Sequence, residues 1–137
     1  MLRQLLPRFF ATVFLMITLF AVQADDVISE HVDIHQFADL IAENSNNPDV
    51  DIIDVRTPEE FHAGHIADAV VIDFYGKGFV NKLEQLDKNK TYLLYCRSGN
   101  RSGKTLKLMR KLGFKAAYNM KGGMNKWPAA KQAVVKP

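Results

Sequence analysis

The chain has 137 residues, 47% of them hydrophobic and 24% charged, which favours one globular domain and excludes an intrinsically disordered chain. Its formal net charge is +3, and two of the basic residues, Arg3 and Arg8, stand in the first eight positions. Without residues 1–24 the chain carries 16 basic and 15 acidic residues, a balance that predicts no nucleic-acid-binding surface.

The first 24 residues have the three-part layout of a secretory signal peptide. Arg3 and Arg8 precede an uncharged stretch over 9–22, and Val22-Gln23-Ala24 then offers small residues to a signal peptidase. An uncleaved membrane anchor is the alternative, but this stretch is short beside the roughly 20 residues that cross a bilayer. We therefore expect a signal peptide over 1–24 and a single periplasmic domain over 25–137, with no stable membrane association after cleavage.

Strand-like and helix-like segments alternate along the rest of the chain. Short β-branched or apolar runs predict a first strand that begins at 27–28. They predict four further strands, over 50–55, 70–72, 91–95 and 116–120. Apolar residues at helical spacing predict helices after an N-cap at Asp33, over 79–86 and over 102–112, the last ending at Gly113. This alternation predicts an α/β fold with a mostly parallel sheet of about five strands and helices on both faces. In such folds the active crevice lies beyond the carboxyl ends of the strands.

The only cysteine, Cys96, directly follows the predicted strand over 91–95. A turn around its side chain would aim backbone N–H groups at the sulfur, Gly99 tolerates a positive φ, and the next helix adds its positive end. Together with Arg97 and Arg101 these groups favour the nucleophilic thiolate and a bound anion. We therefore expect an exposed, alkylatable thiol with a lowered pKa; a buried core cysteine is the alternative. The candidate anion-binding residues are Arg97, Ser98, Gly99, Asn100, Arg101 and Ser102.

Three motifs, in family order, resemble those of the rhodanese family. The segment 96–102 resembles the active-site loop of single-domain rhodaneses, 54–69 an upstream signature, and 122–127 a C-terminal signature. Met124 departs from the pattern, which usually has Trp or Phe at that position, so altered packing is expected there. With the predicted signal peptide, the chain most resembles the small periplasmic rhodaneses encoded with bacterial phage-shock proteins.

The resemblance implies a rhodanese-like fold and a thiosulfate sulfurtransferase. The Cys96 thiolate would take the sulfane sulfur of thiosulfate as a persulfide, release sulfite, and pass the sulfur to cyanide or a thiol in a ping-pong scheme. Arg97 matches a position associated with holding the sulfonate group, whereas Arg101 could bind substrate or point to a carboxylate. No cofactor or metal is implied, and a monomer is expected.

Four further residues are candidates for supporting roles: Asp54, Arg56, Glu60 and His65. We expect Arg56 to pair with Glu60 or Glu59 and so to brace the active-site loop, in preference to a catalytic role for Asp54 and Arg56. His65 could shuttle protons, but a structural histidine hydrogen-bonded to the backbone is favoured. Trp127 is expected to anchor the core.

Two other functions remain as alternatives. Protein phosphatases and arsenate reductases also place a cysteine in an anion-binding loop, but the phosphatase pattern has five residues between Cys and Arg, whereas Cys96 and Arg101 enclose four. Tyr95 also stands where those phosphatases commonly have histidine. The second alternative is a domain that carries sulfur or contacts proteins without turning over thiosulfate.

Overall fold

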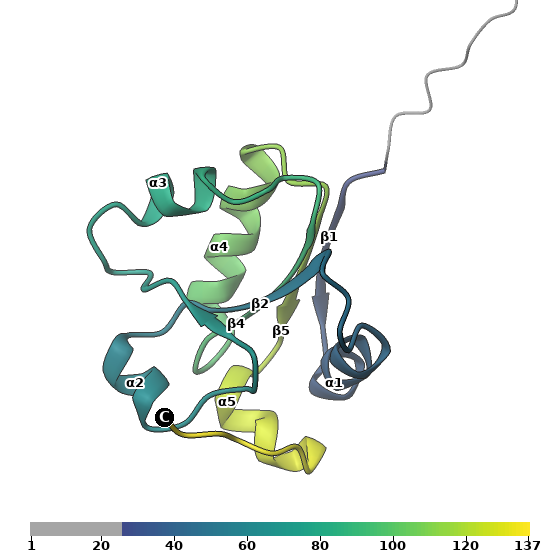
Figure 1. Ribbon diagram of the computed structural model, residues 1–137, viewed down its shortest axis with the longest axis vertical. Coiled ribbons are helices and arrows are strands. Elements are labelled where there is room, and N and C mark those ends of the chain that lie inside the picture. The colour runs from purple at the N-terminus through teal and green to yellow at the C-terminus, as the bar shows by residue number, and fades with distance from the viewer. Residues whose placement is uncertain (1–25) are drawn as a thin grey trace, which may run out of the picture.

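The computed structural model describes residues 26–137, so the predicted signal peptide over 1–24 lies outside the described residues. A five-stranded sheet with the order β1-β5-β4-β2-β3 forms the centre of the molecule, and every strand pair in the described part of the chain is parallel (Figure 1). The strands are β1 (Ile28–Val32), β2 (Val50–Asp54), β3 (Val70–Val71), β4 (Thr91–Tyr95) and β5 (Ala116–Met120). The predicted α/β fold is confirmed, with a sheet that is wholly parallel.

Helices cover both faces of this sheet, as predicted. The helices are α1 (Ile34–Glu43), α2 (Pro58–His62), α3 (Phe79–Glu84), α4 (Asn100–Lys111), α5 (Gly123–Lys126) and the 3-10 helix η1 (Trp127–Ala130). In Figure 1, α3 and α4 lie on one side of the sheet and α1 on the other. Both α2 and α5 are additions to the predicted elements, too short for an apolar period to reveal.

Alternating strand residues supply two separate cores. Ile53 and Leu94 join the cluster under α3 and α4, while Ile52 and Leu93 join the cluster under α1. The second cluster contains Trp127, which is 2% exposed, so its predicted place in the core is confirmed. Met124, the departure from the family pattern, packs against this same cluster.

Two local features explain where the main helices begin. Asp33 forms a capping box, because its side chain accepts from the backbone N–H groups of His35 and Gln36 while the Gln36 side chain accepts from the Asp33 N–H. Helix α4 begins at Asn100, earlier than predicted, because Gly99 turns the chain in the left-handed region with φ of 92°. The predicted C-terminal Gly113 follows α4, with φ of 87°.

The parallel register brings the carboxyl ends of the strands to one edge. Asp54 pairs with Tyr95, and Val32 with Met120, so the segments after β1, β2, β4 and β5 all leave the sheet at that edge. Helices α2 and α5 lie there, below the strands in Figure 1. Among residues 26–137 no helix has the length and apolar character to cross a membrane.

Candidate active site

Cys96 lies where β4 ends, at the predicted edge of the sheet. The candidate anion-binding residues are divided between two elements: Arg97, Ser98 and Gly99 form the connecting loop, and Asn100, Arg101 and Ser102 form the first turn of α4. We refer to residues 96–99 as the Cys96 loop.

Helix α5 holds the Cys96 loop from the other side. The backbone N–H of Met124 donates to the Cys96 carbonyl oxygen, and that of Asn125 donates to the Arg97 carbonyl oxygen, both at 2.9 Å. A Cβ atom at Gly123 would collide with the same Cys96 oxygen and with the Arg97 backbone. The third sequence motif therefore has a geometric role, because only a glycine lets α5 approach the loop so closely.

Two hydrogen bonds converge on the Cys96 sulfur. The Gly99 N–H donates to Sγ at 3.1 Å, and the Ser102 hydroxyl donates to it at 3.3 Å. Burial raises the pKa of Cys96, but the hydrogen bonds from the Ser102 side chain and from the backbone of Ser102, Ser98 and Gly99 outweigh burial and leave the pKa below its ordinary value. Backbone N–H groups of the turn stabilise the thiolate as the sequence predicted, and the Ser102 hydroxyl is a further donor that the sequence analysis did not name.

The prediction of an exposed thiol is wrong, because Cys96 is 0% exposed. Its sulfur lies beneath the loop and against Ser102 of α4, and the residue belongs to the core cluster under α3 and α4. An open pocket of about 420 Å³ adjoins the loop instead. The residues that line it are Thr57, Glu60, Tyr75, Arg97, Ser98, Asn100 and Arg101.

Arg101 points to a carboxylate, the second of the two roles left open for it. Its guanidinium donates to both Glu60 carboxylate oxygens at 2.8 Å. The bonds from Arg101, together with the Thr57 N–H, overcome burial and lower the pKa of Glu60 to about 2, while the pKa of Arg101 is raised by the same pair. Arg97 is exposed at the pocket, and no ion pair within residues 26–137 involves it. Arg97 is therefore the guanidinium that remains available to an anion.

The predicted pairing of Arg56 with Glu60 or Glu59 is wrong. Arg56 pairs with Asp54, from Nη2 to Oδ2 at 2.7 Å, and also donates to the Gly64 carbonyl oxygen at 2.8 Å. Both partners are buried, at 6% and 0% exposure, and Asp54 Oδ1 also accepts from the Arg56 backbone N–H at 2.9 Å. This pair braces the segment after β2, and Glu60 braces the Cys96 loop through Arg101.

His65 makes the type of contact that the sequence favoured. Its Nδ1 atom lies 3.0 Å from the Phe61 carbonyl oxygen, and its ring stacks on Phe61 with centroids 3.6 Å apart. The backbone of His65 also pairs with Val135, which places the C-terminal end of the chain beside α2 (Figure 1). None of these contacts involves the Cys96 loop.

The sequence interpretation missed two residues near the loop. Tyr75, which is 70% exposed, lines the pocket and lies over Arg101, with its ring centroid 5.6 Å from the guanidinium carbon. Nothing in the segment 73–78 indicated this. Asn119, which is 1% exposed, donates to the Gly99 carbonyl oxygen at 3.3 Å and lies 2.9 Å from His31 Nδ1. A polar side chain inside a buried strand was the available signal for Asn119.

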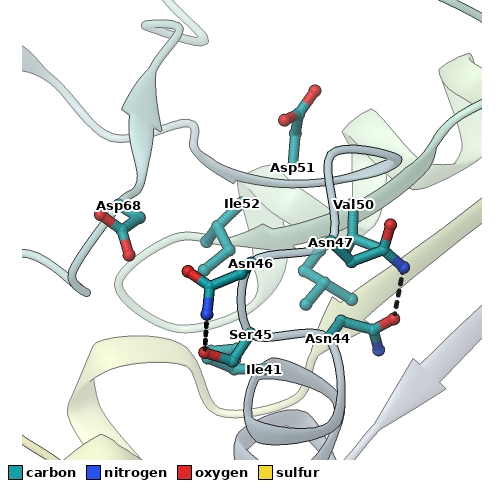
Figure 2. Close-up of a pocket in the computed structure, with 10 residues that line it drawn as sticks. Ile41, Asn44, Ser45, Asn46, Asn47, Val50, Asp51, Ile52 and Asp68 are labelled. Atoms are coloured by element: carbon teal, nitrogen blue, oxygen red, sulfur yellow. Dashed lines mark hydrogen bonds between the residues drawn. The ribbon is translucent and has the colours of Figure 1, made fainter.

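A second pocket, of about 340 Å³, lies between the end of α1 and β2 (Figure 2). Its rim carries the side chains of Asn44 and Asn47, and the Asn47 side-chain amide donates to the Asn44 side-chain oxygen at 3.1 Å. Asn46, in the turn between them, also lines the pocket. It brings together no thiol, imidazole or guanidinium, so the chemistry indicated by the sequence lies at the Cys96 loop. Within residues 26–137, no cluster of three His, Cys, Asp or Glu side chains is arranged to hold a metal ion.

Comparison with known proteins agrees with this geometry. The model of the rhodanese-like domain family matches residues 37–130. The putative sulfurtransferase YtwF of Bacillus subtilis is 43% identical over 76 residues, which cover 56% of this chain and 71% of that protein. A sulfurtransferase of Allochromatium vinosum is 28% identical over 68% of this chain and 85% of its own length.

Solved structures show the same fold. The crystal structure of a rhodanese-related protein from Thermoplasma volcanium has a TM-score of 0.65 and 27% identity, covering 79% of this chain and 99% of that one. Some relatives are longer, and the match spans 59% of the uncharacterized protein YqhL of Bacillus subtilis. The fold, the three motifs and the match over 37–130 together show that the chain belongs to the rhodanese-like domain family.

Proposed function

We propose that the protein is a thiosulfate sulfurtransferase in which Cys96 carries the transferred sulfur. The observation that carries this proposal is the pair of hydrogen bonds from Gly99 and Ser102 to Sγ, which lower the pKa of a buried thiol. A thiolate is the form of cysteine that attacks sulfur. The sulfurtransferase relatives support the same chemistry.

In the first half-reaction the Cys96 thiolate attacks the outer sulfur of thiosulfate. A bond forms between Sγ and that sulfur, the sulfur–sulfur bond of thiosulfate breaks, and its electron pair leaves with sulfite. Negative charge passes from Sγ to the terminal sulfur of the persulfide, and backbone N–H groups of the loop and the Ser102 hydroxyl stabilise both anions. Arg97, exposed and outside any ion pair of the described residues, is suited to hold the sulfonate oxygens.

In the second half-reaction a thiolate or cyanide attacks the terminal sulfur. The new bond forms on the acceptor, the persulfide bond breaks, and its electron pair restores the Cys96 thiolate, which gives a ping-pong scheme. Because Cys96 is 0% exposed, substrate access requires displacement of part of the Cys96 loop.

The position of Arg101 argues against phosphate ester hydrolysis. Phosphatase chemistry needs the loop arginine to stabilise the phosphoryl oxygens, whereas Arg101 is held by both Glu60 oxygens at 2.8 Å. The shorter loop between Cys96 and Arg101 also suits a sulfur atom better than a tetrahedral phosphate.

The decisive experiment is intact-mass analysis after incubation with thiosulfate. We expect the wild-type protein to gain one sulfur atom, the Cys96→Ser variant to gain none, and cyanide to remove the added sulfur as thiocyanate. Absence of the gain in the wild type, or turnover of p-nitrophenyl phosphate at a rate comparable to that of thiosulfate, would contradict the proposal.

A further inference from the structure

We propose that the sulfur acceptor is the thiol of an acidic protein, which docks on a row of lysines along α4; this inference rests on the proposed sulfurtransferase function. The row consists of Lys104, Lys107 and Lys111, and we refer to it as the α4 lysine stripe. The sequence features used to recognise the family do not include it.

Charge is strongly separated along the chain. All 15 acidic residues precede Lys88, whereas 13 of the 18 Lys and Arg residues lie at or after it. The net charge of residues 25–137 is near zero, but the segment before Lys88 is acidic and the segment from Lys88 onward carries only basic charges. The second segment contains the Cys96 loop and α4.

Helical geometry places the lysines on one line that starts at the active-site pocket. Lys104, Lys107 and Lys111 follow Asn100 at spacings of four, three and four residues, so all four lie on one side of α4. Leu106 and Met109 are buried on the opposite side. Asn100 lines the active-site pocket, and the stripe extends from it for about 16 Å at 1.5 Å per residue.

The stripe is not neutralised locally. All three lysines are exposed, and none takes part in an ion pair within residues 26–137. Helix α4 contains no acidic residue, whereas α1, on the other face of the sheet, carries Asp39 and Glu43 and no Lys or Arg. A positive field thus extends from the pocket along α4 without a counter-charge on the same helix.

This geometry fits a protein better than a small thiol or a membrane. A small thiol needs only the pocket, so a row of charges that extends well beyond it would add nothing to its binding. A membrane surface lying across α4 would present no sulfur acceptor at the pocket. An acidic protein can contact the stripe and bring a cysteine to the pocket at Asn100. When part of the Cys96 loop is displaced, that thiolate attacks the terminal persulfide sulfur, the persulfide bond breaks, and Cys96 leaves as the thiolate.

The test compares two synthetic peptides that each contain one cysteine, flanked either by glutamates or by glutamines. The protein is purified from cells that express the whole chain and is loaded with sulfur by thiosulfate. Loss of the extra sulfur is then followed by intact mass. At low ionic strength we expect the glutamate peptide to react about tenfold faster than the glutamine peptide, and the difference to shrink to about twofold at about 0.5 M salt.

A charge-reversed variant, K104E/K107E/K111E, should lose this preference while its reaction with uncharged 2-mercaptoethanol stays within about twofold of wild type. The matched control is K82E/K131E/K136E, which changes the net charge equally at exposed positions outside α4. We expect the control to keep most of the preference. Equal losses in the two variants would overturn the proposal, because net charge alone would then explain the effect.

Two further measurements separate the possible failures. Binding of the glutamate peptide with serine in place of cysteine, followed by fluorescence anisotropy, tests docking without chemistry. If no persulfide forms but this peptide binds through the stripe, the docking surface stands and the proposed reaction fails. If the peptides show no preference while vesicles of anionic phospholipid bind in a stripe-dependent way, the partner is a membrane surface and the acidic-protein proposal is overturned.

Discussion

Ser102 and Gly99 reach the same sulfur from different elements, and this convergence decides the state of Cys96. A buried thiol with no donors has a raised pKa and behaves as a small hydrophobic side chain. Here Gly99 supplies a backbone N–H from the loop, and Ser102 supplies a hydroxyl from α4. The chemistry of the thiol therefore depends on how accurately α4 is held against the loop.

Removal of the Ser102 hydroxyl should raise the pKa of Cys96. In Ser102→Ala we expect persulfide formation at neutral pH to slow about tenfold, since a hydrogen bond to a charged group contributes about 1.5–3 kcal/mol. The rate should recover at higher pH. The pH dependence of persulfide formation measures the shift. Thr105→Val is the matched control, because it removes another buried hydroxyl of α4, one that bonds the Arg101 carbonyl oxygen; an equal pH shift in both variants would contradict a specific role for Ser102.

The Glu60–Arg101 pair should stabilise the protein in a defined pH window. The folded-state pKa of Glu60 is about 2 and its ordinary value is 4.5, so its stabilisation is complete above about pH 4.5 and is lost as the pH falls towards 2. Glu60→Gln should lower the free energy of unfolding by about 1–2 kcal/mol at pH 7, after allowance for solvent screening, and by much less near pH 2. Urea unfolding at both pH values tests this, with exposed Glu59→Gln as the control. A loss that is independent of pH would rule out the ion pair as its source.

At the scale of elements, α4 and α5 act as the two supports of the Cys96 loop. Helix α4 supplies Ser102 and Arg101, and α5 donates two backbone hydrogen bonds at 2.9 Å to the Cys96 and Arg97 carbonyl oxygens. The loop is thus bonded on both sides, which explains how a short chain segment can keep several N–H groups aimed at one atom.

Gly123→Ala should disrupt this support. The added Cβ meets the Cys96 carbonyl oxygen and the Arg97 backbone, so α5 must move away from the loop. We expect persulfide formation to fall more than about tenfold, because misplacement by about 1 Å can cost about a hundredfold in rate. Gly113→Ala is the control, since Gly113 also has a positive φ, 87°, but has open space around the added Cβ. Its cost is backbone strain alone, and comparable losses of activity in both variants would contradict the role assigned to α5.

The sequence predicts the elements better than it predicts the contacts between them. The run 91–95, Thr-Tyr-Leu-Leu-Tyr, is short and rich in aromatic and aliphatic side chains, and it forms β4 with the predicted bounds. Helices α2 and α5 have only five and four residues and show no apolar period. The partner of Arg56 was not predictable, because Asp54, Glu59 and Glu60 all lie within reach along the chain and only the fold chooses among them. The burial of Cys96 was missed for the same reason, since it results from how α4 packs against β4.

At the scale of the whole molecule, every described strand and helix lies after the expected cleavage site. Strand β1 begins at Ile28, after the expected cleavage site at Ala24, and all of its pairing is with β5. Cleavage there would therefore remove no residue of a described element or of either core. The residues that line the active-site pocket or bond to the Cys96 sulfur all lie at or after Thr57, so we expect removal of residues 1–24 to leave the chemistry unchanged.

We therefore expect the protein to be exported and to begin at Asp25 in its mature form. Intact mass of the protein released by osmotic shock measures both the compartment and the cleavage site. A shortened chain in which Met1 is followed directly by Asp25 should stay in the cytoplasm and form the persulfide as fast as the mature protein after purification, because it retains every described element. A chain that retains Met1 and sediments with membranes would instead identify residues 9–22 as an anchor and would overturn the prediction of a cleaved signal.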